Sequence, residues 1–403
     1  MTSLDEQLEI LLANVEIEEP KSELAKKLQR SRDSGKKLVV KLGVDPTAPD
    51  LHLGHAVVLD KLAQFQRLGH RIVLIIGDFT ARIGDPTGRN TTRPPLSEEE
   101  IDANAQTYLS QLGRLLDVDN VEIRKNSEWL KALTFEDIVK LAGRMTVAQM
   151  LQRTDFKNRL SENLPISLHE ILYPLMQGYD SVMIDADIEL GGTDQLFNNL
   201  VGRQLQSSYG KPGQMVLCMP LLVGTDGVQK MSKSKHNYIA VTEDASSMFG
   251  KVMSLPDEAM EPYMKSVSGW GPGETARRLA ALRTGGCHPM ELKIDLAKAI
   301  VERFHSPAAA GRAELHFRES YQRKGDSAYA AVSAAELLSR AELAVLDLVL
   351  HLEPGFSKAH AKRMIAQSAV RIDGTACTSF DAPVRLHAGQ KIEIGKHKKV
   401  KLV

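Results

Sequence analysis

Two histidines near residue 50 have the spacing and the surroundings of a phosphate-binding site. His52 and His55 stand in a His-Leu-Gly-His run, between a predicted strand and the start of a predicted helix. The free N–H groups and the positive dipole end of a helix favour an anion, and parallel sheets bind ligands at the carboxyl ends of their strands. Thr47 lies in the connecting loop, and Gly54 has no side chain to block an adenine ring or a ribose. This segment therefore predicts a nucleotide site.

A group of cations follows the last predicted core strand. Lys230 and Lys233 belong to the run Lys-Met-Ser-Lys-Ser, which comes after a Gly-Thr-Asp-Gly turn and is predicted to be a mobile loop. Two ammonium groups three residues apart can close on a polyphosphate and stabilise the charge that builds up during transfer. The alternative is an ordinary solvated basic loop, but this pentapeptide arises by chance in only about one in ten thousand chains. Together with the histidines, it indicates phosphate chemistry.

The elements that must position these residues follow the pattern of a parallel α/β sheet. Almost continuously apolar runs of the strand type alternate with helical patterns, as expected for strands covered on both faces. The predicted strands are 37–44, 71–77, 121–125, 181–188 and 215–223, and the predicted helices between them include 54–68, 97–112 and 195–209. Ser97, with Glu100 three residues later, is predicted as a helix N-cap. We expect a doubly wound, Rossmann-like catalytic domain over residues 1–237.

The remainder of the chain predicts two further domains. Residues 238–330 show helices punctuated by Pro and Gly, and the polar, Ala-rich stretch 324–339 is either a linker or a weak helix. Residues 341–403 form the third predicted unit, a small α+β module. Its segment 351–403 has ten Lys or Arg against four Asp or Glu, about +6 of charge in a chain whose total is zero. A nucleic-acid surface is therefore expected in this module.

Composition limits the classes of protein that the chain can belong to. Its 403 residues are 43% hydrophobic and 25% charged, which suits a folded protein with two or three cores. The longest apolar runs, 72–76 and 215–223, are shorter than the roughly 20 residues that span a bilayer, so an integral membrane protein is not expected. The N-terminal segment lacks the basic start and apolar core of a secretory signal, which predicts a cytoplasmic protein. The three cysteines are far apart, and no metal-ligand set is predicted.

The two phosphate-site motifs, in this order and on this sheet, resemble the signatures of the class I aminoacyl-tRNA synthetases. The similarity is to the bacterial tyrosyl-tRNA synthetases at three further motifs: Gly84-Asp-Pro-Thr-Gly-Arg89, Tyr173-Pro-Leu-Met-Gln-Gly-Tyr-Asp180 and Gly191-Gly-Thr-Asp-Gln195. The C-terminal segment resembles a small RNA-binding module first described in a ribosomal small-subunit protein, on the motifs 361–365 and 370–374. The resemblance covers most of the chain and is weakest between about residues 240 and 340.

The resemblance implies a ligase that joins tyrosine to tRNA through tyrosyl-adenylate. A carboxylate that is already ionised at neutral pH attacks the α-phosphate of ATP, so catalysis needs positioning and charge stabilisation rather than a general base. The implied catalytic residues are His52, His55, Thr47, Lys230 and Lys233, with Mg²⁺ on the pyrophosphate oxygens. The residues implied to bind ATP are Gly54, Gly192, Asp194 and Lys233, with Gly192 and Asp194 at the ribose.

The resemblance also implies an amino-acid pocket and an RNA-binding surface. Tyr173, Gln177 and Asp180, at spacings of four and three, share one face of a helix. By the resemblance, Tyr173, Gln177 and Asp85 hold the α-ammonium group, Gln195 approaches the carboxylate, and Asp180 accepts the phenolic proton. The residues implied to bind tRNA are Lys358, Lys362, Arg363 and Arg371. The family also implies a homodimer.

Two positions depart from the pattern of many bacterial relatives. Lys41 stands where a tyrosine that hydrogen-bonds the phenol is usual, and we expect it to pair with Asp180 and tune the hydroxyl site. The rival expectation is that Lys41 points to solvent. Ser368 lies where a glycine is usual, so a positive φ there would strain the turn. In the last residues, Val400 and Leu402 alternate with lysines and are expected to pack inward.

Three alternative functions stay open at the level of sequence. A tryptophanyl enzyme is disfavoured by the polar helix face that ends at Asp180. A nucleotidylyltransferase that uses His-x-Gly-His without tRNA is disfavoured by the full Lys-Met-Ser-Lys-Ser loop and the basic C-terminal module. A paralogue kept only for RNA binding is disfavoured by four intact residues, although intact residues do not prove turnover: His52, His55, Lys230 and Lys233.

Overall fold

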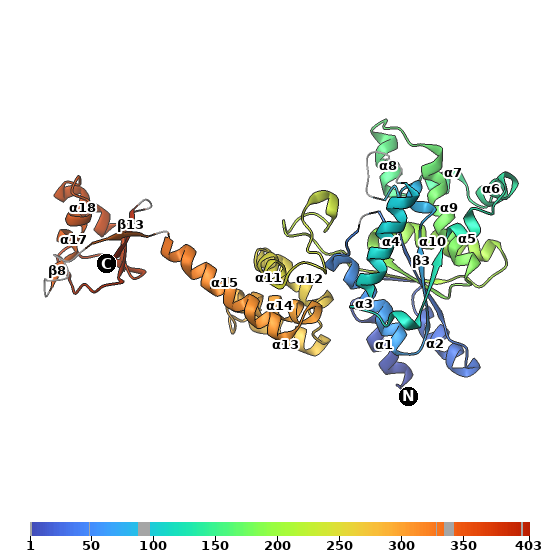
Figure 1. The fold of residues 1–403 in the computed structure, drawn as a ribbon, viewed down its shortest axis with the longest axis horizontal. Helices are drawn as coiled ribbons and strands as arrows, with labels where there is room; N and C mark the ends of the chain where they lie inside the picture. Colours follow the sequence, from blue (N-terminus) through green and yellow to red (C-terminus); the bar gives the residue numbers. More distant parts are fainter. Residues whose placement is uncertain (1, 48, 88–96, 328, 334–341, 396–397) are drawn as a thin grey trace. The chain divides into compact units, whose positions relative to one another are not determined.

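The computed structural model describes residues 2–47, 49–87, 97–327, 329–333, 342–395 and 398–403 (Figure 1). The chain divides into two compact units, Met1–Glu314 and Leu315–Val403. The parallel sheet and most of the later helices belong to the first unit. The finer division into domains at 1–237, 238–330 and 341–403 stays a prediction.

A six-stranded sheet forms the centre of the first unit. Its strands lie in the order β1-β6-β5-β2-β3-β4, and all neighbours are parallel except β1 and β6. The strands are β1 (Ile17–Glu19), β2 (Val39–Val44), β3 (Arg71–Ile76), β4 (Val121–Lys125), β5 (Ile188–Gly192) and β6 (Met215–Met219). From β2 the chain adds β3 and β4 on one side and then β5 and β6 on the other, so the order reverses between β2 and β5. This confirms the predicted doubly wound sheet.

The prediction of a strand at 181–188 is wrong. Most of this segment ends helix α9 (Leu168–Met183) and forms the turn after it, where Asp185 has a φ of 51°, and strand β5 begins only at Ile188. The alternation of Ile184, Ala186 and Ile188 with aspartates imitates the period of a strand, which is why the pattern misled the prediction. The short antiparallel strand β1 was not predicted, because its three residues lie in an acidic segment with a helical pattern.

The predicted helices of the α/β part are confirmed, with ends displaced by at most one residue. They are α3 (Leu53–Arg67), α4 (Glu98–Leu112) and α10 (Leu196–Ser208). Ser97 caps α4 as predicted, since Glu100 N donates to Ser97 Oγ at 3.2 Å and Ser97 N donates to Glu100 Oε2 at 2.9 Å. The remaining helices of this part are α1 (Leu4–Leu12), α2 (Glu23–Ser34), α5 (Ser127–Leu130), α6 (Phe135–Ala142), α7 (Val147–Met150) and α8 (Thr154–Ser161).

Helix α9 carries one wall of the later site and packs on one face of the sheet. Val39, Val73 and Ile75 of β2 and β3 form a buried cluster with Tyr173 and Met176 of α9. Helix α10 lies beside α9 (Figure 1), while α3 packs along β2, β3 and β5. Because alternate residues of a strand face the same side, the odd-numbered residues of β2 point toward α9.

The region after residue 238 is helical, as predicted. Its helices are α11 (Ala245–Met253), α12 (Met260–Ser266), α13 (Pro272–Arg283), α14 (Pro289–Phe304) and α15 (Pro307–Ser327). Helix α11 packs on α14. The stretch 324–339 was predicted as a linker or a weak helix, but α15 continues to Ser327 and a strand follows, while residues 334–339 lie outside the described residues.

The second unit is a small α+β module, as the sequence predicted. A five-stranded sheet has the order β10-β9-β12-β13-β7, and β11 pairs with β8. Its elements are β7 (Ala330–Val332), β8 (Leu343–Ala344), α17 (Val345–Leu352), α18 (Lys358–Ala366), β9 (Val370–Ile372), β10 (Thr375–Cys377), β11 (Pro383–Val384), β12 (Lys391–Ile394) and β13 (Lys398–Leu402). Val400 and Leu402 are fully buried, as expected. Ser368 has a φ of 57°, so the condition under which a strained turn was expected is met. Among the described residues, no helix is long and apolar enough to cross a membrane.

Candidate active site

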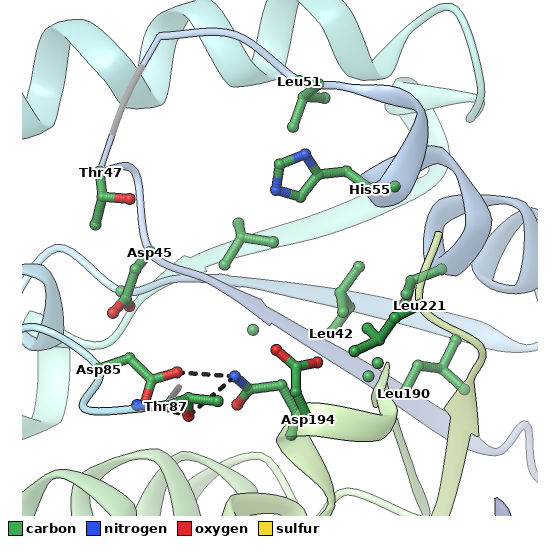
Figure 2. A pocket seen from close by; sticks show the side chains of 18 of the residues that line it. Leu42, Asp45, Thr47, Leu51, His55, Asp85, Thr87, Leu190, Asp194 and Leu221 are labelled. Carbon is green, nitrogen blue, oxygen red and sulfur yellow. Dashed lines mark hydrogen bonds between the residues drawn. The ribbon is translucent and has the colours of Figure 1, made fainter. Parts of the chain in front are cut away.

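A pocket of about 880 Å³ opens at the carboxyl ends of β2 and β5 (Figure 2). Strand β2 pairs with β3 along its whole length, from Val39 to Val44, but pairs with β5 only at Val40 and Lys41. Beyond Lys41 the two strands therefore separate, and the pocket lies in the opening. In Figure 2, His55 and Asp194 lie on opposite sides of this space.

The pocket brings together every residue predicted for catalysis, ATP or tyrosine except Lys41. Those that line it are Thr47, His52, Gly54, His55, Asp85, Tyr173, Gln177, Asp180, Gly192, Asp194, Gln195, Lys230 and Lys233. They come from the loops after β2, β3, β5 and β6, from the start of α3, from the last residue of β5, and from α9. Of the motif that begins at Gly84, residues 88 and 89 lie outside the described residues.

The two histidines lie against each other at the start of α3. Their ring centroids are 3.8 Å apart, and His52 N donates to His55 Nδ1 at 3.2 Å. Burial lowers the pKa of His55 to about 3, and burial next to His55 and the loop lysines puts the pKa of His52 further below its ordinary value. Both rings are therefore neutral at pH 7 and offer N–H donors to a phosphate rather than positive charge. A Cβ on Gly54 would lie 3.0 Å from two atoms of the His52 ring, so glycine also makes room for this histidine.

The two loop lysines differ in their surroundings. Lys230 Nζ forms an ion pair with the Asp194 carboxylate. Lys233 Nζ lies 5.4 Å from the centre of the Tyr108 ring and has no hydrogen-bond partner among the residues that the structure describes. Burial lowers the pKa of Lys233 to about 8, so the group is still mainly an ammonium at pH 7. A half-buried cation without an acceptor strongly favours the arrival of an anion.

Asn237 holds together the two ends of the loop that carries Lys230 and Lys233, called here the lysine loop. Its Oδ1 accepts from Ser232 N at 2.8 Å, and its Nδ2 donates to Asp226 Oδ2 at 2.7 Å and to the Lys230 carbonyl at 3.2 Å. Its own carbonyl accepts from Thr225 N at 2.8 Å. The side chain is buried, so these hydrogen bonds are shielded from water. The loop thus leaves and re-enters the fold at one fixed point.

Carboxylates dominate the opposite half of the pocket. Tyr173 Oη donates to Asp45 Oδ2 at 2.8 Å, and Gln195 Nε2 donates to Asp85 Oδ2 at 2.8 Å. Burial raises the pKa of Asp85, but the Arg153 guanidinium at 3.1 Å and hydrogen bonds from Thr87 and Gln195 outweigh this and hold the pKa below its usual value. Asp85 is therefore ionised at pH 7 and can accept from an ammonium group.

At Asp180, burial outweighs the effects that lower the pKa. Its Oδ1 accepts from Trp129 Nε1 at 2.8 Å, and the whole carboxyl group is buried. Burial raises the pKa of Asp180 to about 7, despite the nearby Lys41 cation and the hydrogen bonds from Trp129 and Asn126. The group is therefore only partly ionised near neutral pH, and a hydrogen bond from a donor such as a phenol O–H would favour its ionised form.

The expected pair between Lys41 and Asp180 is not formed, and the rival expectation of an exposed Lys41 is also wrong. Lys41 is fully buried, and its Nζ lies 3.0 Å from Glu189 Oε1. The same nitrogen donates to the Gln177 carbonyl at 2.9 Å and to Ser181 Oγ at 2.8 Å. Lys41 and Glu189 are direct neighbours in the sheet register, so the pairing follows from the fold and places Lys41 beneath the pocket rather than in its wall.

Sequence analysis missed several residues that shape the site. Asp45 was predicted only as part of a loop, although an acidic residue directly after a core strand marks a ligand-binding edge. Glu189 could have been found as a lone acid within an apolar strand, next to a strand that carries a lone lysine. Arg153 and Asn237 carry no local pattern, because their partners Asp85 and Asp226 are identified only by the folded chain.

The four predicted tRNA contacts lie in the second unit. Lys358, Lys362 and Arg363 belong to α18, and Arg371 belongs to β9. All four side chains are exposed, and Lys362 Nζ lies 4.1 Å from the centre of the Phe380 ring. They are therefore available to phosphate groups, and their role stays a prediction.

Comparison with known proteins identifies the family. Residues 33–322 match the family described as tRNA synthetases class I (W and Y). The chain is 48% identical to "Tyrosine--tRNA ligase 2" of Photorhabdus laumondii over 99% of this chain and 100% of that protein. It is 49% identical to the tyrosine–tRNA ligase of Moorella thermoacetica over 98% of this chain and 95% of that protein. The chain belongs to the class I tyrosyl-tRNA synthetases.

This synthetase is a tyrosine–tRNA ligase that uses ATP, and solved structures support the fold. The tyrosyl-tRNA synthetase of Archaeoglobus fulgidus, solved with L-tyrosine, covers 77% of this chain and 100% of its own length with a TM-score of 0.63 at 23% identity. The enzyme of Aeropyrum pernix gives a TM-score of 0.62 at 19% identity, over 78% of this chain and 99% of its own.

The raised pKa of Asp180 predicts that tyrosine binding weakens in mild acid. Between pH 8 and pH 6 the ionised fraction of a group with a pKa of about 7 falls about tenfold, so the KM for tyrosine in ATP–pyrophosphate exchange should rise by up to about tenfold. Asp180→Asn is the control: its KM should be higher throughout and independent of pH over this range. An equal pH dependence in both proteins would show that another group is responsible.

Proposed function

We propose that this synthetase forms tyrosyl-adenylate in the pocket between β2 and β5. An oxygen of the tyrosine carboxylate bonds to the α-phosphorus of ATP, and the bond from that phosphorus to pyrophosphate breaks. A ribose hydroxyl oxygen of the 3′-terminal adenosine of tRNA(Tyr) then bonds to the tyrosyl carbonyl carbon, the bond from that carbon to the AMP oxygen breaks, and AMP and the hydroxyl proton are released. The observation that carries this proposal is that a single pocket joins a wall of carboxylates to a wall of phosphate-binding donors.

The phosphate-binding wall supplies the catalysis. Neutral His52 and His55 and the Thr47 hydroxyl donate hydrogen bonds to the phosphates, while Lys230 and Lys233 neutralise the charge that develops on the leaving pyrophosphate. Because Lys230 is paired with Asp194, it has to leave that carboxylate to reach a phosphate. The exchange frees Asp194 to accept from ribose hydroxyls at the time when the nucleotide is bound.

Two glycines leave room for the rest of the nucleotide. A Cβ on Gly192 would lie 2.6 Å from Asp194 Oδ1 and 2.7 Å from Leu221, so any side chain there would displace the carboxylate assigned to the ribose. Gly54, on the opposite wall, keeps the start of α3 open to the adenosine. Mg²⁺ enters with ATP and is held by the oxygens of the leaving pyrophosphate, since it prefers oxygen ligands.

The carboxylate wall selects tyrosine. Asp85, Tyr173 and Gln177 receive the α-ammonium group, and Gln195 approaches the carboxylate that attacks ATP. Asp180, at the other end of the pocket, accepts from the phenol. Phenylalanine would bring no donor to Asp180, and a buried polar group left without its partner is costly.

The second unit binds tRNA through exposed cations. Lys358, Lys362, Arg363 and Arg371 contact phosphate oxygens, and this electrostatic contact is sensitive to salt. The enzyme works in the cytoplasm, where tRNA is charged.

A second copy of the chain covers an apolar surface on α6 and α9. Phe135 is 82% exposed, Leu168 is 81% exposed and Val139 is 54% exposed. A pocket of about 200 Å³ lies in the same area, lined by apolar side chains and His169, and it includes Ile138 of α6 and Leu172 of α9. Exposed apolar patches of this kind mark interfaces, and a self-complementary patch gives a two-fold dimer.

The activation step is tested by amino-acid-dependent ATP–pyrophosphate exchange without tRNA, offering tyrosine, phenylalanine and tryptophan separately. Exchange is expected with tyrosine alone, because Asp180 needs a phenol. Lys233→Ala should lower kcat by about 100-fold or more, the usual effect of removing one transition-state donor. Lys26→Ala, which removes an exposed lysine outside the pocket lining, is the control. Absence of exchange with every amino acid would indicate a binding-only paralogue.

Removal of the four exposed cations of the second unit should separate the two half-reactions. With alanine at 358, 362, 363 and 371, exchange should be unchanged, the KM for tRNA should rise at least about tenfold, and the salt dependence of binding should flatten. The matched control removes four exposed cations of the first unit: Lys26, Arg30, Lys36 and Lys37. Equal loss of exchange and charging would contradict this division of labour.

Phe135→Asp should convert a dimer into a monomer, because a charge at the centre of an apolar interface has no partner. Light scattering coupled to gel filtration measures the mass directly. Val228→Asp, at an equally exposed valine outside the patch, should leave the mass unchanged. A monomeric unmodified protein, or a dimer that survives Phe135→Asp, would place the interface elsewhere.

A further inference from the structure

The Lys41–Glu189 ion pair lies at the last point where β2 and β5 are joined. The two residues are the second and final pair of the register between these strands, and the pocket opens directly beyond them. Their side chains are 0% and 1% exposed. Replacing such a pair with apolar residues is often neutral for stability, so its presence beside a binding site calls for another reason.

The Glu189 carboxylate accepts hydrogen bonds from four side chains. Its Oε1 accepts from Lys41 Nζ and from Gln177 Nε2, the latter at 3.2 Å. Its Oε2 accepts from Ser181 Oγ at 3.1 Å and from Gln214 Nε2. Each carboxylate oxygen therefore has two donors, and the Lys41 ammonium group lies 3.0 Å from Oε1.

An ionised carboxylate can only accept hydrogen bonds, and this decides which way the Gln177 amide faces. The amide nitrogen points to Glu189 Oε1 at 3.2 Å and to Asn199 Oδ1 at 3.0 Å, and the amide oxygen would be repelled by the Glu189 carboxylate. Lys41 also donates to the Gln177 carbonyl, so the Lys41–Glu189 pair contacts both the backbone and the side chain of Gln177. Gln177 lines the pocket, and the atom left to face a ligand is its oxygen, which can only accept.

We propose that the buried Lys41–Glu189 pair determines the specificity of the site for an α-ammonium group, by holding the Gln177 amide with its oxygen toward the ligand. An ammonium group has donors only, so it binds this orientation and not the reverse. Lys41 lies outside the pocket lining, and Glu189, which is only 1% exposed at the edge of that lining, acts through Gln177, so both are positioning residues. The inference rests on the proposed assignment of Gln177 to the α-ammonium of tyrosine.

The test compares three ligands that differ in one group each. Tyrosine has the ammonium and the carboxylate, tyramine keeps only the ammonium, and 3-(4-hydroxyphenyl)propionate keeps only the carboxylate. Their Kd values are measured by calorimetry on the full chain and on the double variant Lys41→Met/Glu189→Met, which removes both charges at once. Glu189→Gln is the second variant: it keeps the shape of the side chain but no longer forces one amide orientation.

Binding of tyrosine and tyramine to the double variant should weaken by about tenfold or more, as for a lost hydrogen bond to a charged group, while binding of the propionate should change less than about twofold. Glu189→Gln should show the same selectivity with a smaller loss, and it carries the test if the double variant does not fold. Lys27→Met is the control, since Lys27 is another buried lysine, 3.7 Å from Asp187, outside the pocket lining. It should leave all three Kd values unchanged.

Two results would overturn the inference. Equal weakening of all three ligands would mean that the pair only supports the fold, and unchanged tyrosine binding would mean that Gln177 keeps its orientation without the pair. Failure of the proposed function looks different, because the unmodified protein would then bind neither tyrosine nor tyramine.

Discussion

The separation of β2 from β5 is the constraint on which the site depends. Their crossover connections run in opposite directions along the sheet, so the two strands are joined at only two positions before their ends diverge. The backbone groups beyond Lys41 are released from mutual pairing, and the loops after both strands can turn toward a ligand. The histidines, the Asp194 carboxylate after β5, and the carboxylates of Asp45 and Asp85 reach one space because this opening exists.

The electrostatics of the pocket divide it into two halves with different tasks. In the half that holds His52 and His55, burial leaves the histidines neutral, so the positive charge among the described lining residues comes from the lysine loop. In the half that holds Tyr173, Arg153 keeps Asp85 ionised, whereas Asp180 has a pKa of about 7. A zwitterion with a phenol and a polyanion can therefore bind next to each other without competing for the same groups.

The parts of this arrangement that depend on local chemistry could be predicted from the sequence. Apolar runs predicted the sheet, the Ser97 cap predicted the start of α4, and short motifs predicted thirteen of the residues that line the pocket. The predictions failed where an element or a contact depends on residues that are distant in the sequence. A helix end with alternating aspartates imitated a strand, and the partner of Lys41 was misassigned because the sequence does not show which strand lies beside β2. Asn237 has partners on both sides of a loop, so only the closed loop reveals its role.

The tie at Asn237 has a consequence for the cost of ordering the lysine loop. Fixing the backbone of one residue costs roughly 1–2 kcal/mol in conformational entropy, so a long free loop would consume much of the binding energy of a nucleotide. Here Ser232 and Lys230 are already held by the Asn237 side chain, and only the few residues from 233 to 236 lie between the tied points. Most of the ordering has taken place during folding, and the binding energy of ATP is left for contacts with the phosphates.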